Sequence, residues 1–182
     1  MSLTAQERAA LVSLARAAVN AEIAGEAPPT PVGAEGVLAQ ELGCFVTLTN
    51  HGRLRGCIGT FQPQGPLGQM VVEMARAASR DGRFVYDPIT PRELGELKVE
   101  VSVLSPLEQT DKPLELEVGR HGVFIVRGGA AGCFLPEVAT DMGWNARQFL
   151  DECCAGKAGL PPNAWEMPGT KVYLFTSEKF DS

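Results

Sequence analysis

Apolar residues repeat with two different periods along this chain, and the order of those periods limits the fold more than any other feature. Apolar residues spaced three and four positions apart predict helices over about 4–22 and 67–78. Alternating or β-branched apolar runs predict strands at 45–49, 53–60, 97–103 and 171–175. Because strands grouped in hairpins are mixed with separate helices, the pattern indicates an α+β fold.

The chain also divides into two parts that resemble each other. Each part has a hairpin that ends in Gly-Cys and an apolar residue, followed by a proline and a helix with an apolar stripe. The first hairpin turns at 50–52, and the second joins 123–126 to 132–135. We therefore predict a single domain over 1–182, built of two similar lobes that meet near 105–113. Each lobe is a small β-sheet with flanking helices, and an internal duplication is one explanation of the likeness.

Composition limits where such a chain works and what it binds. With 45% hydrophobic and 21% charged residues it is typical of a globular protein. No stretch approaches the roughly 18 apolar residues of a membrane span, and charged residues interrupt the N-terminus where a signal peptide has its apolar core. We expect a cytoplasmic protein without a membrane anchor. The formal net charge of −6 disfavours general binding to nucleic acids.

Cysteine and histidine usage disfavours two further kinds of site. Five cysteines are an odd number, and none of them forms a C-x-x-C pair. With only two histidines in the chain, a transition-metal site would need ligands from distant segments. The sequence therefore predicts neither a disulfide framework nor a metal site, and it identifies no cofactor.

The returning strand of the first hairpin carries the strongest chemical signal. Strict alternation places Arg53, Arg55, Cys57 and Gly59 on one face. A guanidinium near a thiol stabilises the thiolate and attracts small anions. Glycine inside a strand, here Gly56 and Gly59, marks a bulge or a close approach of another backbone. The segment therefore predicts either a reactive thiol or an anion-binding pocket.

Structural interpretations of the same residues stay open. Cys57 is also a small apolar residue, and a bulge at Gly56 would turn it into the core. His121 is a candidate general base for Cys57, or a turn histidine that hydrogen-bonds to the backbone. Arg83 lies at the candidate ligand site, or it pairs with Asp81 and ties that loop to the strand of the first hairpin.

Several segments together resemble the AMME-syndrome chromosomal-region protein family over nearly the whole chain. They are Leu54-Arg55-Gly56-Cys57-Ile58-Gly59-Thr60, 81–84, 101–104, 119–122, 134–139 and 157–161. The resemblance implies an α+β protein of two unequal lobes. The family has no established reaction, so no catalytic residues carry over. The resemblance also implies Memo-type proteins and radical S-adenosylmethionine enzymes as partners.

Two functional hypotheses follow. The first is an enzyme or enzyme component that handles a small anionic ligand in a pocket around residues 55–59. In it Cys57 is the nucleophile and His121 moves the proton, and the ligand is held by Arg53, Arg55, Gly56, Gly59 and Arg83. The alternative is a non-catalytic accessory module that binds Memo-type or radical S-adenosylmethionine proteins.

Overall fold

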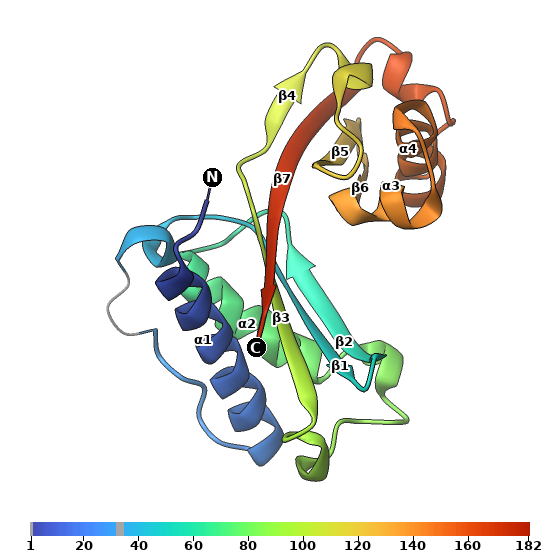
Figure 1. Ribbon diagram of the computed structural model, residues 1–182. Helices are drawn as coiled ribbons and strands as arrows, with labels where there is room; N and C mark the ends of the chain where they lie inside the picture. The colour runs from blue at the N-terminus through green and yellow to red at the C-terminus, as the bar shows by residue number, and fades with distance from the viewer. Residues whose placement is uncertain (1, 32–34) are drawn as a thin grey trace. The chain divides into compact units, whose positions relative to one another are not determined.

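The computed structural model describes residues 2–31 and 35–182, which form two compact units (Figure 1). The first unit comprises the chain up to Leu104 together with Glu178–Ser182, and the second comprises Ser105–Ser177. Both units contain antiparallel strands and helices, so the predicted α+β class is confirmed. Among the described residues, none of the helices has the length and apolar character that a membrane crossing requires.

The first unit is built on a sheet whose central strand is β1 (Cys44–Asn50). β1 pairs antiparallel with β2 (Arg53–Thr60) on one side and with β3 (Leu97–Leu104) on the other, so β2 is an edge strand. The predicted first hairpin is confirmed. His51 and Gly52 form its turn with φ values of 48° and 80°, as the tight turns that match the twist of a hairpin require.

Two helices cover one face of this sheet. α1 (Ala5–Ala24) begins at Thr4 with a capping box, in which the Thr4 hydroxyl accepts from Glu7 N and the Glu7 carboxylate accepts from Thr4 N. α2 (Leu67–Ser79) packs against α1 and against the β1–β2 hairpin. Short 3₁₀ turns complete the unit at η1 (Gly36–Ala39), η2 (Gly82–Phe84) and η3 (Pro91–Glu93).

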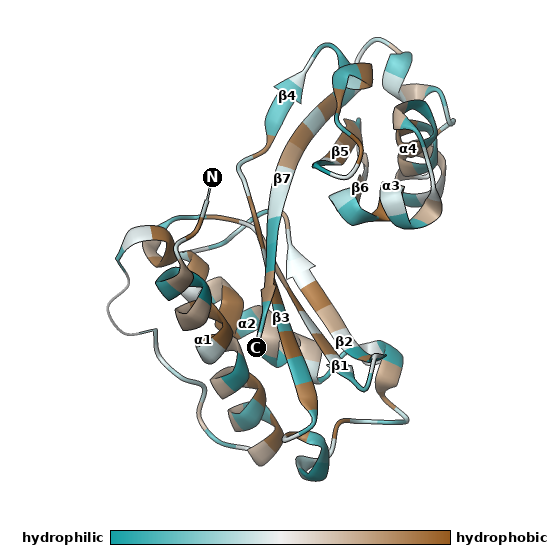
Figure 2. Cartoon of the chain, in the orientation of Figure 1, coloured by the Kyte–Doolittle hydropathy of each residue, from teal (hydrophilic) through white to brown (hydrophobic). Residues whose placement is uncertain are grey.

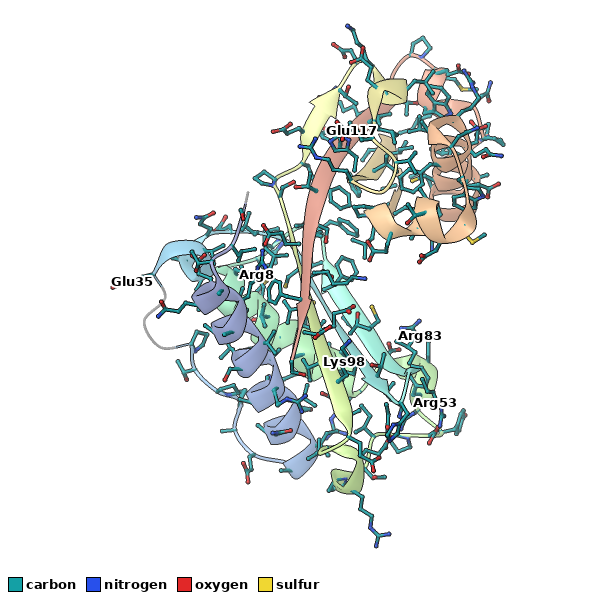
Figure 3. All side chains as sticks on the ribbon, viewed as in Figure 1. Arg8, Glu35, Arg53, Arg83, Lys98 and Glu117 are labelled. Carbon is teal, nitrogen blue, oxygen red and sulfur yellow. The ribbon has the colours of Figure 1, made fainter. Side chains whose placement is uncertain are left out.

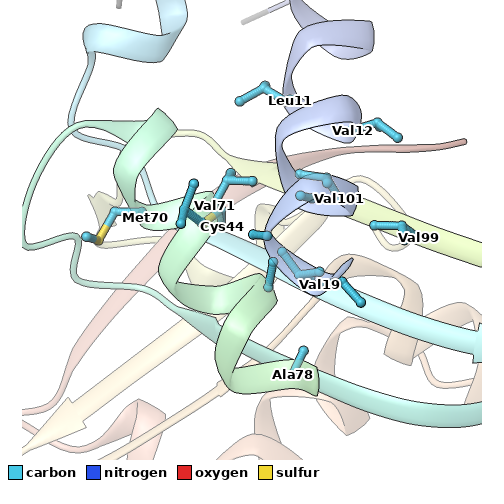
Figure 4. Close-up of a cluster of buried hydrophobic side chains, with 14 of the residues drawn as sticks. Leu11, Val12, Val19, Cys44, Met70, Val71, Ala78, Val99 and Val101 are labelled. Atoms are coloured by element: carbon cyan, nitrogen blue, oxygen red, sulfur yellow. The ribbon is translucent and has the colours of Figure 1, made fainter. Parts of the chain in front are cut away.

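The core of the first unit lies between these helices and the sheet. Alternation along β3 leaves its apolar residues on the helix side and its polar residues on the other, visible as alternating brown and teal bands in Figure 2. Figure 4 shows residues from both helices and from the sheet in this core: Leu11, Val12 and Val19 of α1, Met70, Val71 and Ala78 of α2, and Cys44, Val99 and Val101 of the sheet.

The second unit has its own sheet. β5 (His121–Arg127) pairs with β6 (Ala130–Phe134) as the predicted second hairpin and with β7 (Lys171–Asp181), which also pairs with β4 (Glu108–Thr110). The remaining elements are α3 (Pro136–Met142), α4 (Ala146–Glu152), the π-helical turn η5 (Cys153–Ala158), and the 3₁₀ turns η4 (Pro113–Glu115) and η6 (Ala164–Glu166).

The two units differ in the proportions of their helices. The helices of the first unit have 20 and 13 residues, whereas α3 and α4 have seven residues each. The second core instead relies on aromatic packing, with Phe134 stacked on Phe149 at 5.7 Å and the Trp165 indole donating to Asp151 at 2.7 Å. The proposed internal duplication is not confirmed.

Candidate functional site

A β-bulge in β2 sets the geometry of the candidate site. The pairing register between β1 and β2 shifts between Leu48 and Thr49, which leaves Arg55 as an extra residue without a partner in β1. A bulge breaks the alternation of side chains along a strand. The prediction that Arg53, Arg55 and Cys57 share one face is therefore wrong, since it assumed an unbroken strand.

Arg55 is turned inward and used by the protein itself. Its side chain is only 2% exposed. Nε and Nη2 donate to the Glu93 carboxylate at 2.9 and 3.1 Å, while Nη1 and Nη2 donate to the carboxylate and carbonyl of Asp87 at 3.3 and 3.0 Å. The hydrogen bond from Arg55 lowers the pKa of Glu93 to about 2. Arg55 thus fastens the loop before β3, and a ligand role for it stays a prediction.

Close packing explains why the segment has glycine at two positions. A Cβ added at Gly56 would lie 2.0 Å from the carbonyl oxygen of Ala78, so only glycine lets α2 approach β2 this closely. A Cβ added at Gly59 would lie 2.2 Å from the ring of Phe45 on the neighbouring strand. Both positions confirm the close approach that sequence reasoning expected, although a protein segment fills the space in each case.

Cys57 lies on the face of the β1–β3 sheet turned away from α1 and α2, which we call the helix-free face. Its sulfur is 3.2 Å from the Thr47 hydroxyl on β1, and the residue is half-buried. Thr47 also lies directly opposite Glu100 on β3. The alternative in which the bulge turns Cys57 into the core is wrong, because Cys57 lies opposite Thr47 on the helix-free face and is half-buried.

A pair of charged residues holds the backbone of Cys57 at the sheet edge. The Cys57 N–H donates to the Asp81 carboxylate at 3.0 Å, and Arg83 Nη2 donates to the Cys57 carbonyl at 3.2 Å. Arg83 also donates to Asp81 through Nε at 3.0 Å and Nη2 at 2.6 Å. These bonds from Arg83 lower the pKa of buried Asp81 well below its usual range. The tie between this loop and the first hairpin is confirmed, and it runs to Cys57.

Arg83 is also an arginine whose charge interacts with Cys57. The hydrogen bond to Asp81 is the main reason that the pKa of Arg83 is raised, and negative charge on Cys57 adds a smaller contribution in the same direction. Sequence reasoning assigned this interaction to Arg55, which lies closer to Cys57 along the chain but not along the folded strand.

The helix-free face is hollowed beside Thr47. A cavity of about 460 Å³ is lined by Thr47, Thr49, His51, Gly52, Lys98 and Glu100. Two ion pairs join its charged residues to β7: Lys98 to Asp181 at 2.8 Å and Glu100 to Lys179 at 3.5 Å. Figure 3 marks Lys98 on β3. Sequence reasoning missed this polar cavity, although the alternation of charged residues along β3 had indicated a polar face.

The two remaining predicted site residues make contacts of other kinds. Arg53 pairs with Asp87 and projects from the β2 side of the first unit (Figure 3). His121 belongs to the second unit, where its Nδ1 accepts a hydrogen bond from Glu117 N at 2.9 Å, as its backbone-bonding interpretation expected. Its pairing with Cys57 stays a prediction. Across residues 2–31 and 35–182, no three potential metal ligands gather in one place.

Comparisons with known proteins agree along nearly the whole chain. The family described as AMMECR1 matches residues 12–180. A protein of Methanothermobacter thermautotrophicus is 41% identical, covering 98% of this chain and 95% of that protein, and Protein TK0174 of Thermococcus kodakarensis is 42% identical, covering 94% and 88%. The crystal structure of uncharacterized protein PH0010 from Pyrococcus horikoshii is similar, with a TM-score of 0.85 and 36% identity over 99% of this chain and 93% of that one.

Proposed function

The chain belongs to the AMMECR1 family, and from that premise we propose that it is an enzyme, or a component of one, whose Cys57 thiol reacts with a small anionic substrate. One observation carries this proposal. Within the segment from Leu54 to Thr60, packing accounts for both glycines and ion pairing accounts for Arg55, whereas the hydrogen-bond partner that the described residues offer the thiol is the Thr47 hydroxyl on the helix-free face. Cys57 is half-buried, so this residue stays partly exposed to solvent.

Arg83 supports the anionic character of the substrate. Its Nε and Nη2 donate within the protein, while none of the described residues accepts from Nη1. The N–H groups of Nη1 can therefore donate to an oxygen of a carboxylate or phosphate, and such charge-assisted hydrogen bonds are strong. The same positive charge favours a thiolate at Cys57. In this proposal Arg83 keeps the ligand-holding role predicted for it from the sequence, and Arg55, which is buried in ion pairs, does not share it.

The proposed step is a nucleophilic displacement at carbon, with the Cys57 sulfur as the nucleophile. The thiol proton of Cys57 passes to water, and the sulfur forms a bond to an electrophilic carbon of the substrate while the leaving group departs with the bonding electron pair. Attack of water or of a second nucleophile on the same carbon then breaks the carbon–sulfur bond and restores the thiol. The Thr47 hydroxyl, 3.2 Å from the sulfur, orients it during both displacements.

Alkylation kinetics test the proposal with a control inside the same chain. Iodoacetamide is reacted with the full-length protein at pH 7, and each cysteine is followed by peptide mass spectrometry. Cys133 is the matched control, because it is also half-buried but burial raises its pKa. We expect Cys57 to react about tenfold faster than Cys133 or more. Equal rates at the two cysteines would remove the proposed role of Cys57.

Two arginine variants separate the charge of Arg83 from a general effect of charge. Arg83→Gln is expected to slow alkylation of Cys57 several-fold, because a favourable charge near the thiolate is lost. Arg53 is an exposed arginine that lies on β2 with Cys57 but does not bond to it. Arg53→Gln should therefore leave the rate of Cys57 alkylation unchanged. Equal effects of the two variants would contradict the assignment of Arg83. The accessory role toward Memo-type or radical S-adenosylmethionine proteins stays a prediction.

A further inference from the structure

The loop between η2 and η3 exposes two adjacent apolar side chains. Tyr86 is 99% exposed and Val85 is 66% exposed, the two highest values among the large apolar residues of the described chain. Single exposed apolar residues are common on protein surfaces, but neighbouring ones presented together mark interaction sites. Tyrosine is among the residues that most often anchor a protein–protein contact.

The backbone on both sides of Tyr86 is fixed from within the first unit. Phe84 N donates to the Asp81 carbonyl at 2.9 Å, and Asp87 N donates to the Phe84 carbonyl at the same distance. Arg55 Nη2 holds the Asp87 carbonyl at 3.0 Å. Because the loop is already ordered, a partner that binds Tyr86 loses little free energy to ordering it.

An apolar groove lies against the same loop. It has a volume of about 300 Å³, and its apolar lining comes from Ile23, Phe84, Val85, Pro88 and Ile89. Its polar lining comes from Arg55, Ser79, Arg80 and Asp81. This volume is at the small end of the range for ligand pockets. The groove therefore suits one apolar side chain of a partner better than a large free molecule.

The surroundings of the groove are rich in positive charge, although the formal net charge of the whole chain is −6. Ion pairs around the groove bring in only four carboxylates, those of Glu22, Asp81, Asp87 and Glu93. Five arginines pair with them, and four of these, Arg53, Arg76, Arg80 and Arg83, have side chains 43–65% exposed, whereas the side chains of Glu22, Asp81 and Glu93 are at most 21% exposed. A surface with this excess is complementary to an acidic one.

We propose that Val85, Tyr86 and this groove form a docking surface for an acidic segment of a partner protein. The partner places one apolar side chain in the groove, packs against the Tyr86 ring, and brings Asp or Glu residues to the arginines. This inference is independent of the reactivity of Cys57. It gives the bulged arginine of β2 a function, since Arg55 fixes the loop that carries the surface.

Selection from a random peptide library displayed on phage tests the chemistry of the partner directly. The full-length protein is immobilised, and selected peptides are synthesised for affinity measurement by fluorescence polarisation. We expect peptides with an apolar residue flanked by Asp or Glu, and binding that weakens as salt is raised. Selection of peptides without acidic residues would overturn the proposal.

Surface variants locate the binding. Tyr86→Ser is expected to weaken the selected peptides by about tenfold or more, the loss typical of an anchoring residue. Val85→Ser is a second variant at the same surface with the same expectation. Met142→Ser, at another exposed apolar residue (59% exposed) in the second unit, is the matched control and should bind normally. Peptides that bind Tyr86→Ser and Val85→Ser as tightly as the unmodified chain refute the assignment.

Discussion

The ion pair between Arg55 and Glu93 makes the most direct prediction about stability. Replacing Glu93 by Gln keeps the size of the side chain but removes its charge. The Arg55 guanidinium, 2% exposed, is then left with Asp87 as its one carboxylate partner, at 3.3 Å on a side chain that is largely exposed. Removing one partner of a buried pair is costly, because the other charge stays buried without full compensation.

The magnitude follows from the pKa of Glu93, which the hydrogen bond from Arg55 lowers from 4.5 to about 2. Since one pKa unit corresponds to about 1.4 kcal/mol, the ionised carboxylate stabilises the fold by up to about 3 kcal/mol. The Glu93 side chain is 21% exposed, so solvent screens part of this interaction. We expect Glu93→Gln to lower the free energy of unfolding at pH 7 by about 2 kcal/mol.

Urea denaturation followed by circular dichroism at 222 nm measures this change in the unfolding of the first unit, which contains Glu93. The signal comes mainly from α1 and α2, whose 20 and 13 residues belong to the first unit. A loss of this size moves the urea midpoint by on the order of 1 M. Glu96→Gln is the matched control: it lies three residues away and pairs only with exposed His51, so we expect less than about 0.5 kcal/mol.

The pH dependence gives a second readout with a fixed sign. The folded pKa of Glu93 lies below its unfolded value, so its contribution is fully present above about pH 4.5 and is lost as the pH falls toward about 2. Glu93→Gln has no such group, and its stability should fall less steeply across that window. If the variant has the same acid slope as the unmodified protein, or loses under about 0.5 kcal/mol at pH 7, our account of Arg55 is wrong.

Two further predictions concern residues of the first hairpin. Gly56→Ala should lower the free energy of unfolding by about 3 kcal/mol, because its Cβ would lie 2.0 Å from the Ala78 carbonyl oxygen. Gly82→Ala is the control for the same urea assay. A Cβ at Gly82 meets no atom within 4 Å, so this variant should be nearly neutral. His51→Asn should raise the melting temperature slightly, by an amount equivalent to about 0.5 kcal/mol, because Asn tolerates the positive φ of 48° better than His. A destabilised Asn variant would show that the His51 side chain contributes more than its backbone strain costs.

Local patterns determined which elements the sequence predicted well. The capping box at Thr4 and the alternation at 97–103 are interactions between near neighbours, so both are visible in the sequence, and α1 and β3 form as predicted. β7 extends to Asp181 instead of ending near residue 175. Its last residues are polar except Phe180, so they lack an apolar alternation. They hold their place through contacts with β3, such as the ion pair of Lys179 with Glu100, which no local pattern reveals.

The candidate site is formed by contacts between residues that are distant in sequence. The predicted shared face of Arg55 and Cys57 was wrong for this reason. Whether β2 has a bulge is decided by its register with β1, and the burial of Arg55 by carboxylates more than 30 residues further along the chain. A strand read by itself gives strict alternation, which placed the wrong arginine beside the thiol. The sequence could only suggest that Asp81 and Arg83 bind to the first hairpin. Their partners on β2 are the N–H and carbonyl of Cys57, and every residue type has such backbone groups.

The bulge also explains why one short segment serves two sides of the first unit. An unbroken strand would direct Arg55 and Cys57 to the same face, where the carboxylates of Glu93 and Asp87 would compete with any substrate for the guanidinium. With one extra residue at Arg55, its side chain enters the protein and fixes the loop of Tyr86, while the thiol still emerges on the helix-free face. The separation of those two roles requires the bulge, and Gly56 supplies the space that the bulged strand needs beneath α2.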